Sequence, residues 1–246
     1  MKRTILSLMS AAALLTGCSD GVGPGSQISL SFSGGAGISS ANLGFLSAPS
    51  ISDGANVLEI TKAEVVLREI ELKRVEVVDC DVIPEPDGCE KFEVGPVLIT
   101  LPLDGTTSTQ ITIEIDPGSY TEIEFDIHKV SNDDPEDAAF RAAHPDLLDT
   151  SIRVQGTFNG VAFTYVTDLN EEQEFSLVPT LVIDENTAST NLTIVLDLAT
   201  WFVDAQGNLI DPDSANKGGD NENLVRDNIK ASIEAFEDKD KDGSKG

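Results

Sequence analysis

The chain has 246 residues and a formal net charge of −27, which results from 43 acidic and 16 basic side chains. A surface this acidic repels phosphate backbones and anionic headgroups, so the composition argues against nucleic-acid binding. The same surface attracts cations, above all Ca²⁺ with its carboxylate and carbonyl ligands, although acidity also serves simply to keep a protein soluble.

The N-terminus has the layout of a secretory signal. Lys2 and Arg3 precede an apolar run from Thr4 to Leu15, and small residues follow. This order of a basic start, a short apolar run and a small-residue cleavage point is typical of exported proteins. The alternative for this stretch is an ordinary buried helix with one incidental cysteine.

The segment Leu15-Thr16-Gly17-Cys18 resembles the lipobox of bacterial lipoproteins at all four positions. The resemblance implies that residues 1–17 are a signal peptide that is removed, and that Cys18 carries acyl chains such as palmitate. It also implies a bacterial envelope location, and Ser19 after the cysteine is compatible with the outer membrane, on its periplasmic or surface face. We expect residues 18–27, rich in Gly and Ser, to form a flexible tether.

No later apolar run approaches the roughly 20 residues that span a bilayer, so the lipid is the expected membrane attachment. Cys80 and Cys89 remain once Cys18 is lipidated. In an oxidising exterior such a pair predicts a disulfide, which would close a loop bent by two prolines and a glycine. The alternative, a thiolate metal site, lacks further cysteines and a nearby histidine.

Alternating apolar residues predict several strands. Ile28, Leu30 and Phe32 alternate with serines, and a further strand is centred on Val97 to Leu101. The run from Val57 to Val78 is ambiguous, because its apolar spacing also fits a helical stripe. Its many β-branched residues favour two consecutive strands or one long bent strand. The helical stripe would consist of Ile60, Ala63, Leu67 and Ile70.

Two hairpins are predicted. In the first, strands 111–115 and 123–127 flank Asp116-Pro117-Gly118-Ser119, and a three-residue loop would set Ile113 opposite Ile123. In the second, strands 152–158 and 161–165 flank Asn159-Gly160, which suits the left-handed residues of a type I′ turn and sets Phe158 opposite Val161.

Further strands are expected at 175–183 and 192–202, with a short return strand before residue 210. Pro135 to Ala143 predicts a short helix that Asp133 or Asp134 would cap. Apolar residues at helical spacing predict an amphipathic helix from about Glu222 to Glu237. These residues are Val225, Ile229, Ile233 and Phe236.

About nine strands with little helix predict an all-β fold, a single antiparallel β-sandwich of the Ig-like or transthyretin-like kind. We expect it to span residues 28–210, with a short inserted helix. Residues 211–246 would then supply a polar break, the C-terminal helix and an acidic tail. Bacterial envelope lipoproteins with a β-sandwich behind a short tether have a similar layout, which implies no activity.

The acidic tail contains Asp238-x-Asp240-x-Asp242-Gly243, which resembles the first half of an EF-hand-type calcium loop. Alternate carboxylates converge on one ion and the glycine permits the sharp turn. The acid expected at loop position 12 would fall beyond residue 246, and lysines are interleaved, so a solvated charged tail is the alternative.

Catalytic motifs are weak. The sequence has no Gly-x-Ser-x-Gly elbow, and only His128 and His144 are available for a Ser-His-Asp arrangement. The sequence therefore predicts a non-enzymatic binding or structural module with no cofactor, and a possible envelope protein as its partner. A calcium-responsive adhesion or matrix module is the alternative, and a hydrolase ranks third.

Overall fold

The computed structural model describes residues 26–35, 50–75, 89–92, 95–184, 187 and 189–245. Cys18, Cys80 and the predicted signal peptide lie outside these residues, so the lipidation and the disulfide stay predictions. Across the described residues, no helix combines the length and the apolar character needed to span a bilayer.

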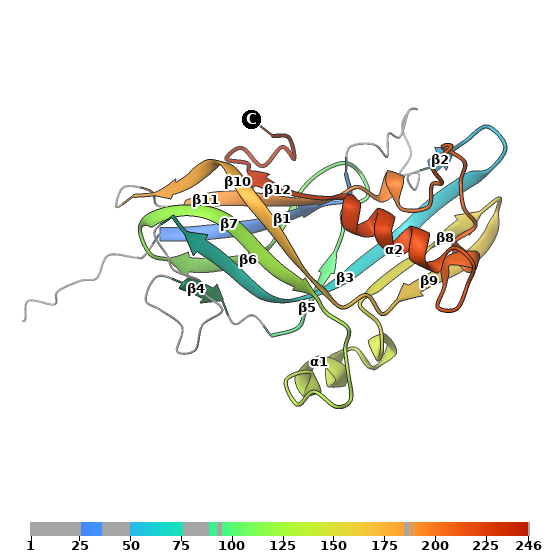
Figure 1. The fold of residues 1–246 in the computed structure, drawn as a ribbon, viewed down its shortest axis with the longest axis horizontal. Helices are drawn as coiled ribbons and strands as arrows, with labels where there is room; N and C mark the ends of the chain where they lie inside the picture. Colours follow the sequence, from blue (N-terminus) through green and yellow to red (C-terminus); the bar gives the residue numbers. More distant parts are fainter. Residues whose placement is uncertain are drawn as a thin grey trace, which may run out of the picture.

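The fold is mostly β, which confirms the predicted class, and its strands form two sheets (Figure 1). The small sheet has the order β12-β11-β1-β6. Its strands are β1 (Ser26–Ser33), β6 (Ser108–Ile115), β11 (Ser189–Leu196) and β12 (Ile233–Glu237).

The large sheet has the order β10-β7-β3-β8-β9, and three short strands also pair with β3. The main strands are β3 (Val57–Arg74), β7 (Gly118–Ile127), β8 (Ile152–Phe158), β9 (Val161–Thr167) and β10 (Glu171–Ile183). The short ones are β2 (Ser50–Ser52), β4 (Cys89–Phe92) and β5 (Val97–Thr100).

Strand β3 organises the large sheet. Its N-terminal part pairs with β8 and its C-terminal part with β7, so both strands are joined to one 18-residue strand. The pairing is irregular at Glu69, whose φ of 48° marks a bulge. One long strand is therefore the correct choice among the predicted alternatives, because β-branched residues such as Val65 and Val66 pack well in a buried strand.

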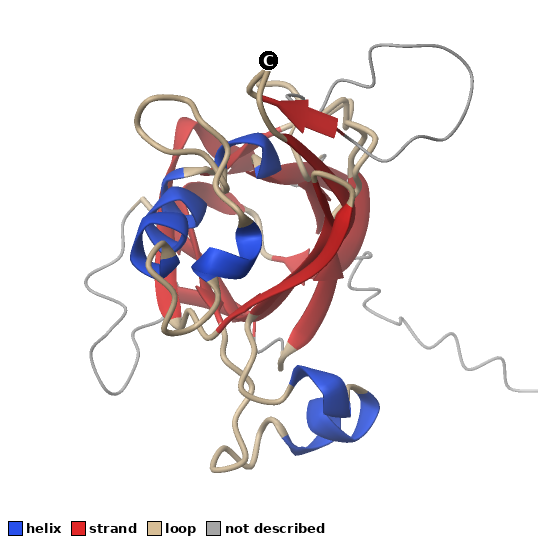
Figure 2. Ribbon diagram, turned by 90° about the vertical axis from the view of Figure 1, so that its right-hand side faces the viewer, coloured by secondary structure: helices blue, strands red, loops and turns tan. Residues whose placement is uncertain are grey.

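A single hydrophobic core contains residues of both sheets, and Figure 2 shows the strands surrounding a common interior. Leu30 of β1, Ile60 of β3 and Ile123 of β7 are all fully buried there. Aromatic side chains complete the core. Tyr165 and Phe202 are in edge-to-face contact, with ring centroids 5.1 Å apart.

The prediction of a purely antiparallel fold is wrong for one central pair. β1 and β11 run parallel, with Leu30 opposite Leu192 and Phe32 opposite Ile194. The two strands lie about 160 positions apart in the sequence, and an alternating pattern buries the same face in either direction. Local patterning therefore carried no information on this pairing.

The first predicted hairpin is also wrong in its pairing, although both strands exist. β6 pairs with β1, setting Ile113 opposite Ile28, whereas β7 pairs with β3 and β10. The chain thus changes sheets at Asp116 and Pro117. Both arrangements bury the isoleucines, and only the non-local partners decide between them.

The second hairpin is confirmed, with Phe158 opposite Val161 and positive φ values at Asn159 and Gly160. Between β7 and β8 the chain makes an excursion that contains α1 (Ala138–Ala143) and a short 3-10 turn, Pro145–Leu147. The short helix is thus confirmed, but its N-cap residue is Asp137, whose side chain makes no capping bond.

The C-terminal helix is shorter than predicted. α2 covers Glu222–Ala231, and the chain then forms β12, which pairs with β11. Ser232 ends the helix, since its hydroxyl donates to the Ile229 carbonyl and accepts from the Trp201 indole N–H at 2.8 Å. Ile233 packs in the main core, so these C-terminal residues belong to the same folded body as β1.

Two further 3-10 turns, Leu198–Thr200 and Pro212–Ala215, connect the later elements. The predicted strand at 192–202 ends at Leu196, because Asp197 caps the first of these turns, which begins at Leu198. The predicted return strand is reduced to one bridge between Val203 and Leu209.

Candidate functional site

The acidic motif at the C-terminus is folded against the small sheet. Asp238 directly follows β12, and its backbone N–H donates to the Asn191 carbonyl of β11 at 3.0 Å. Its side chain is turned inward, so that Asp238 is only 2% exposed, whereas Asp240 and Asp242 are exposed. The alternative of a tail held wholly in solvent is therefore wrong for Asp238.

The Asp238 carboxylate accepts hydrogen bonds from three neutral donors. Oδ2 accepts from the Thr193 hydroxyl at 2.7 Å and from the Gly243 N–H at 2.9 Å, while Oδ1 accepts from the Asp242 N–H at 3.2 Å. Burial alone would disfavour the charged form, but the hydrogen bonds outweigh it and lower the pKa of Asp238.

The loop closes around this carboxylate by two left-handed residues. Lys241 has a φ of 61° and Gly243 a φ of 81°. Glycine adopts that conformation at no steric cost, which explains its place at the sharp turn. The Ser244 N–H then donates to Asp242 Oδ1 at 2.7 Å. Each aspartate offers one oxygen within 4.8 Å of the others, so the three predicted residues are brought together.

Small polar side chains of the sheet support the loop. Asn191 donates to the Asp238 carbonyl and to Thr193, and it accepts from Ser31 of β1 at 2.7 Å. Asn191, Thr193 and Ser31 are all buried, because the loop covers the sheet face that points away from the core. A buried network with satisfied partners fixes one arrangement of the chain.

Two contacts with the start of β6 tie down the middle of the loop. The Thr107 hydroxyl donates to the Lys241 carbonyl at 2.7 Å, and Lys241 Nζ donates to the Thr109 hydroxyl at 3.2 Å. Lys239 is held near Glu237 by an ion pair of 3.3 Å. The lysines of the motif thus point to sheet residues and leave Asp240 and Asp242 facing solvent.

The fit of this loop to a cation is partial. Oxygen donors of three aspartates converge, which suits Ca²⁺, but Asp238 already accepts three hydrogen bonds. The loop could therefore hold a cation through the exposed carboxylates together with Asp238.

Surface hollows border the same loop. One of about 350 Å³ is lined by Val178, Pro179, Phe236 and the loop, and one of about 270 Å³ lies on the other side, beside Ser29 and Lys241. A third of about 610 Å³ reaches from Phe236 to Gly35. Val178 is 67% exposed at the rim, so this end of the molecule combines concave surface with exposed apolar side chains.

Sequence reasoning found the three aspartates and missed their support. Asn191 and Thr193 belong to a sequence that suggested only a glycosylation motif, and Ser31 stood out merely as the polar half of an alternating strand. The available signal was that the outward positions of β1 and β11 are small and uncharged, which is what a covering segment requires.

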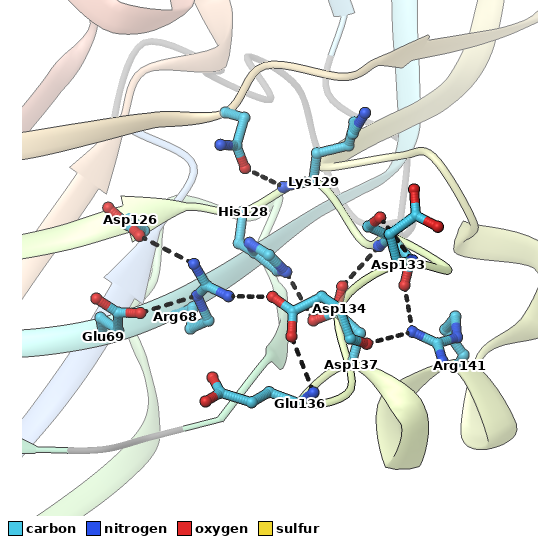
Figure 3. A network of polar contacts seen from close by, with 12 residues as sticks. Arg68, Glu69, Asp126, His128, Lys129, Asp133, Asp134, Glu136, Asp137 and Arg141 are labelled. Atoms are coloured by element: carbon cyan, nitrogen blue, oxygen red, sulfur yellow. Dashed lines mark hydrogen bonds and ion pairs between the residues drawn. The ribbon is translucent and has the colours of Figure 1, made fainter.

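His128 lies elsewhere, at the base of the excursion between β7 and β8 (Figure 3). A hydrogen bond of 2.7 Å joins its Nε2 to Asp137 Oδ1, and the Ser131 N–H donates to the other Asp137 oxygen at 2.6 Å. His128 is 4% exposed and Asp137 is fully buried. No hydrogen-bond partner of His128 Nδ1 lies among the described residues.

An ion pair attaches the same excursion to the sheet, and hydrogen bonds from Arg141 hold the excursion together. Arg68 of β3 donates to Asp134 at 2.8 Å, and Arg141 of α1 donates to the carbonyls of Ser131 and Asp134 (Figure 3). Phe140 and Leu147 pack beneath it in a small separate cluster. His128 therefore fastens a folded excursion, and its ring is shielded from solvent.

His144 lies at the end of α1, where its ring contacts that of Phe140, with ring centroids 4.7 Å apart. Within the part of the chain that the structure describes, neither histidine ring forms a hydrogen bond with a serine hydroxyl. Scans against protein-family models and searches of curated proteins and of solved structures found no match to the chain.

Proposed function

We propose that the protein is a lipid-anchored, non-enzymatic envelope protein whose β domain acts as a binding or structural module. The anchoring rests on one observation, the four-position match of Leu15-Thr16-Gly17-Cys18 to a lipobox behind a signal-like run. Cys18 would carry the lipid, and the outer membrane is the proposed location.

Lipid labelling tests the anchor. In the bacterial host, the wild-type chain should incorporate a palmitate analogue and sediment with the outer membrane, because cleavage before Cys18 exposes the acylated residue. Cys18→Ser should abolish the label, whereas Cys89→Ser, which removes another cysteine, should retain it. Label that persists in Cys18→Ser would contradict the proposal.

The finer architecture that we propose is a two-sheet β-sandwich. The shared core of residues from both sheets supports it. The parallel pair β1–β11 departs from Ig-like and transthyretin-like patterns, so the proposal is limited to two packed sheets. On such a scaffold, function resides in loops and edges.

The binding role is supported by the hollows around the C-terminal loop. We propose an envelope protein as partner there, because exposed Val178 and the neighbouring Pro179 offer apolar contact beside polar groups of the loop. The buried His128–Asp137 pair is better explained as an anchor of the excursion than as a catalytic dyad, which supports the non-enzymatic assignment.

Site-specific photo-crosslinking in the intact envelope tests this face. A crosslinker in place of Val178 should capture a discrete partner band, because Val178 borders the hollow. Val161, on the β8–β9 hairpin, is a matched control, since it is equally apolar and 70% exposed. No crosslink at Val178, or the same product at both positions, would contradict a binding face at the loop.

A calcium-responsive adhesion or matrix module is the second candidate. One observation favours it: the Asp238 loop is folded with three carboxylates close together. Calcium at 100 times its dissociation constant should stabilise the fold by roughly 2.7 kcal/mol, a shift of several degrees in Tm. No shift between calcium and a chelator would eliminate this candidate.

Substitutions at exposed residues test whether the loop causes this shift in Tm. Asp240→Asn with Asp242→Asn should remove the calcium effect, because both side chains face solvent and the bonds that Asp238 accepts from Thr193 and the Gly243 N–H stay in place. Asp213→Asn with Asp220→Asn removes the same charge from exposed positions outside the loop and should leave the effect unchanged.

A further inference from the structure

The outer face of the large sheet carries carboxylates directly opposite one another. Across three adjacent strands, Glu71 of β3 pairs with Glu124 of β7, which pairs with Glu174 of β10. Lys91 of β4 is the register partner of Glu71 on its other side. Like charges in directly opposite positions destabilise a sheet, so this row requires compensation.

The neighbouring rows add further acids. Asp126 of β7 lies between Arg68 of β3 and Glu172 of β10, while Glu122 lies between Lys73 and Ser176. We call Glu71, Glu122, Glu124, Asp126, Glu172 and Glu174 the carboxylate ladder. One oxygen each of Glu122, Glu124 and Glu174 lies within 4.8 Å of the others.

The lysine of this face forms its ion pairs with β7 and attracts Glu172 and Glu174 of β10 only at longer range. Lys73 Nζ contacts Glu122 at 2.9 Å and Glu124 at 2.5 Å. Arg68 contacts Asp126 at 3.7 Å, Glu69 at 3.2 Å and Asp134 at 2.8 Å.

Among the described residues, no cation forms an ion pair with Glu172 or Glu174. Glu174 lies instead beside two other carboxyl groups, with one oxygen each of Glu122, Glu124 and Glu174 within 4.8 Å of the others, and Glu172 lies opposite Asp126. Carboxyl groups this close can hydrogen-bond to each other only while one of them is protonated.

Strand β10 is placed where such a contact can control pairing. It is an edge strand of the large sheet, and its pairing with β7 is interrupted between Ser176 and Leu181. The segment Glu171–Ser176 is therefore joined to the sheet separately from Leu181–Ile183. On the inner face of this segment, Phe175 stacks on Phe125 with ring centroids 5.7 Å apart.

We propose that the segment Glu171–Ser176 of β10 is a pH-sensitive edge, which stays paired with β7 while the ladder holds shared protons and separates as the carboxyl groups ionise. The hydrogen bond to Glu124 raises the pKa of Glu172 to about 7, and that to Glu122 raises the pKa of Glu174. Lys73 remains charged across this range, because its bonds to Glu124 and Glu122 outweigh burial and raise its pKa.

The directions of these pKa shifts decide whether pairing of β10 is stronger at low or at high pH. A carboxyl group whose pKa is higher in the paired state than in the open state stabilises pairing at low pH. That contribution is lost as pH rises through the folded pKa, so opening of Glu171–Ser176 increases between pH 5.5 and pH 8. Exposed groups are screened by solvent, which limits the increase to roughly tenfold.

Hydrogen exchange of the full-length chain, measured at pH 5.5 and pH 8 and corrected for intrinsic rates, tests the proposal. The opening constant of amides in 171–176 should rise severalfold at pH 8, while that of β8 and β9 should not change. Glu172→Gln with Glu174→Gln should remove most of this rise, because glutamine cannot ionise. These variants are neutral changes on an exposed face and should fold.

Glu171→Gln is the matched control. Glu171 lies in the same segment but contacts Lys230 of α2 at 3.3 Å and not the ladder, so this variant should keep the pH dependence. Three results would overturn the proposal. They are equal opening at both pH values, an equal rise in β8 and β9, or loss of the rise in Glu171→Gln.

Discussion

On the outer face of the small sheet, the buried Asp238 carboxylate accepts hydrogen bonds from a hydroxyl and two backbone N–H groups, whereas on the outer face of the large sheet the main neighbours of Glu172 and Glu174 are other carboxyl groups. The first arrangement lowers the pKa of Asp238 and the second raises that of Glu172. The same chemical group therefore fastens one segment as an anion and another as an acid. The net charge of the chain predicts neither outcome, because the neighbours decide it.

The largest expected effect is at the buried carboxylate. Asp238→Ala removes the acceptor of Thr193, Asp242 N–H and Gly243 N–H, and should lower the free energy of unfolding by about 2–3 kcal/mol. Chemical denaturation of wild type and variant measures this difference. Asp240→Ala is the control in the same loop, and a loss equal to that of Asp238→Ala would contradict the role of the buried contacts.

Removing one hydrogen bond to Asp238 should lower the free energy of unfolding by less than removing its carboxylate. Thr193→Val keeps the shape of the side chain and removes one hydrogen bond to a carboxylate, which should cost about 1–2 kcal/mol in the same denaturation experiment. Thr112→Val, at an exposed position of β6, should change stability little. If both variants behave alike, the hydrogen bond of Thr193 does not hold the loop.

Stability should depend on pH in two separate ranges. The Asp238 contribution is present above its unfolded pKa and is lost as pH falls through the lower folded value, below about pH 4. The Glu172 contribution is present at low pH and is lost as pH rises towards 7, by at most about 1 kcal/mol after solvent screening.

Thermal melts across pH 2–9 should therefore show a maximum near pH 5. Glu172→Gln should flatten only the neutral side and Asp238→Asn only the acid side. A profile that rises monotonically to pH 8 in wild type would contradict the assignment of the two faces.

A change in salt concentration should produce the smallest difference between the carboxylate ladder and the Asp238 loop. At pH 8, raising ionic strength screens the repulsion within the carboxylate ladder and should stabilise the segment Glu171–Ser176 by a few tenths of a kcal/mol. The bonds that Asp238 accepts come from neutral donors, so the loop should respond less. Exchange of 171–176 and of 238–244 at low and high salt compares them directly, and equal responses would remove the distinction.

The positions of most strands could be predicted from the sequence, because alternation is local. Their partners could not. Ile111 to Ile115 alternates in the same way whether it faces β7 or β1, and β1 meets β11 across most of the chain. The end of α2 was also hidden, since Ile233 and Phe236 fit a helical stripe as well as β12.

Only part of the candidate site could be predicted from the sequence, because the other part depends on non-local strand pairing. The spacing of Asp238, Asp240 and Asp242 is a local motif and could be found. Its burial depends on Asn191 and Thr193, which the fold brings to it from another strand. The carboxylate ladder could not be predicted, because its acids face one another only once Glu174 is paired with Glu124.

The central claim is that the C-terminal loop is a folded part of the domain, organised by the Asp238 carboxylate. Amide hydrogen exchange at Asp242 and Gly243, resolved by NMR, tests it most directly. We expect both amides to be protected in the wild-type chain and to lose protection in Asp238→Ala, while amides of β8 and β9 stay protected. Exchange of Asp242 and Gly243 at the rate of an unfolded chain in the wild type would contradict it.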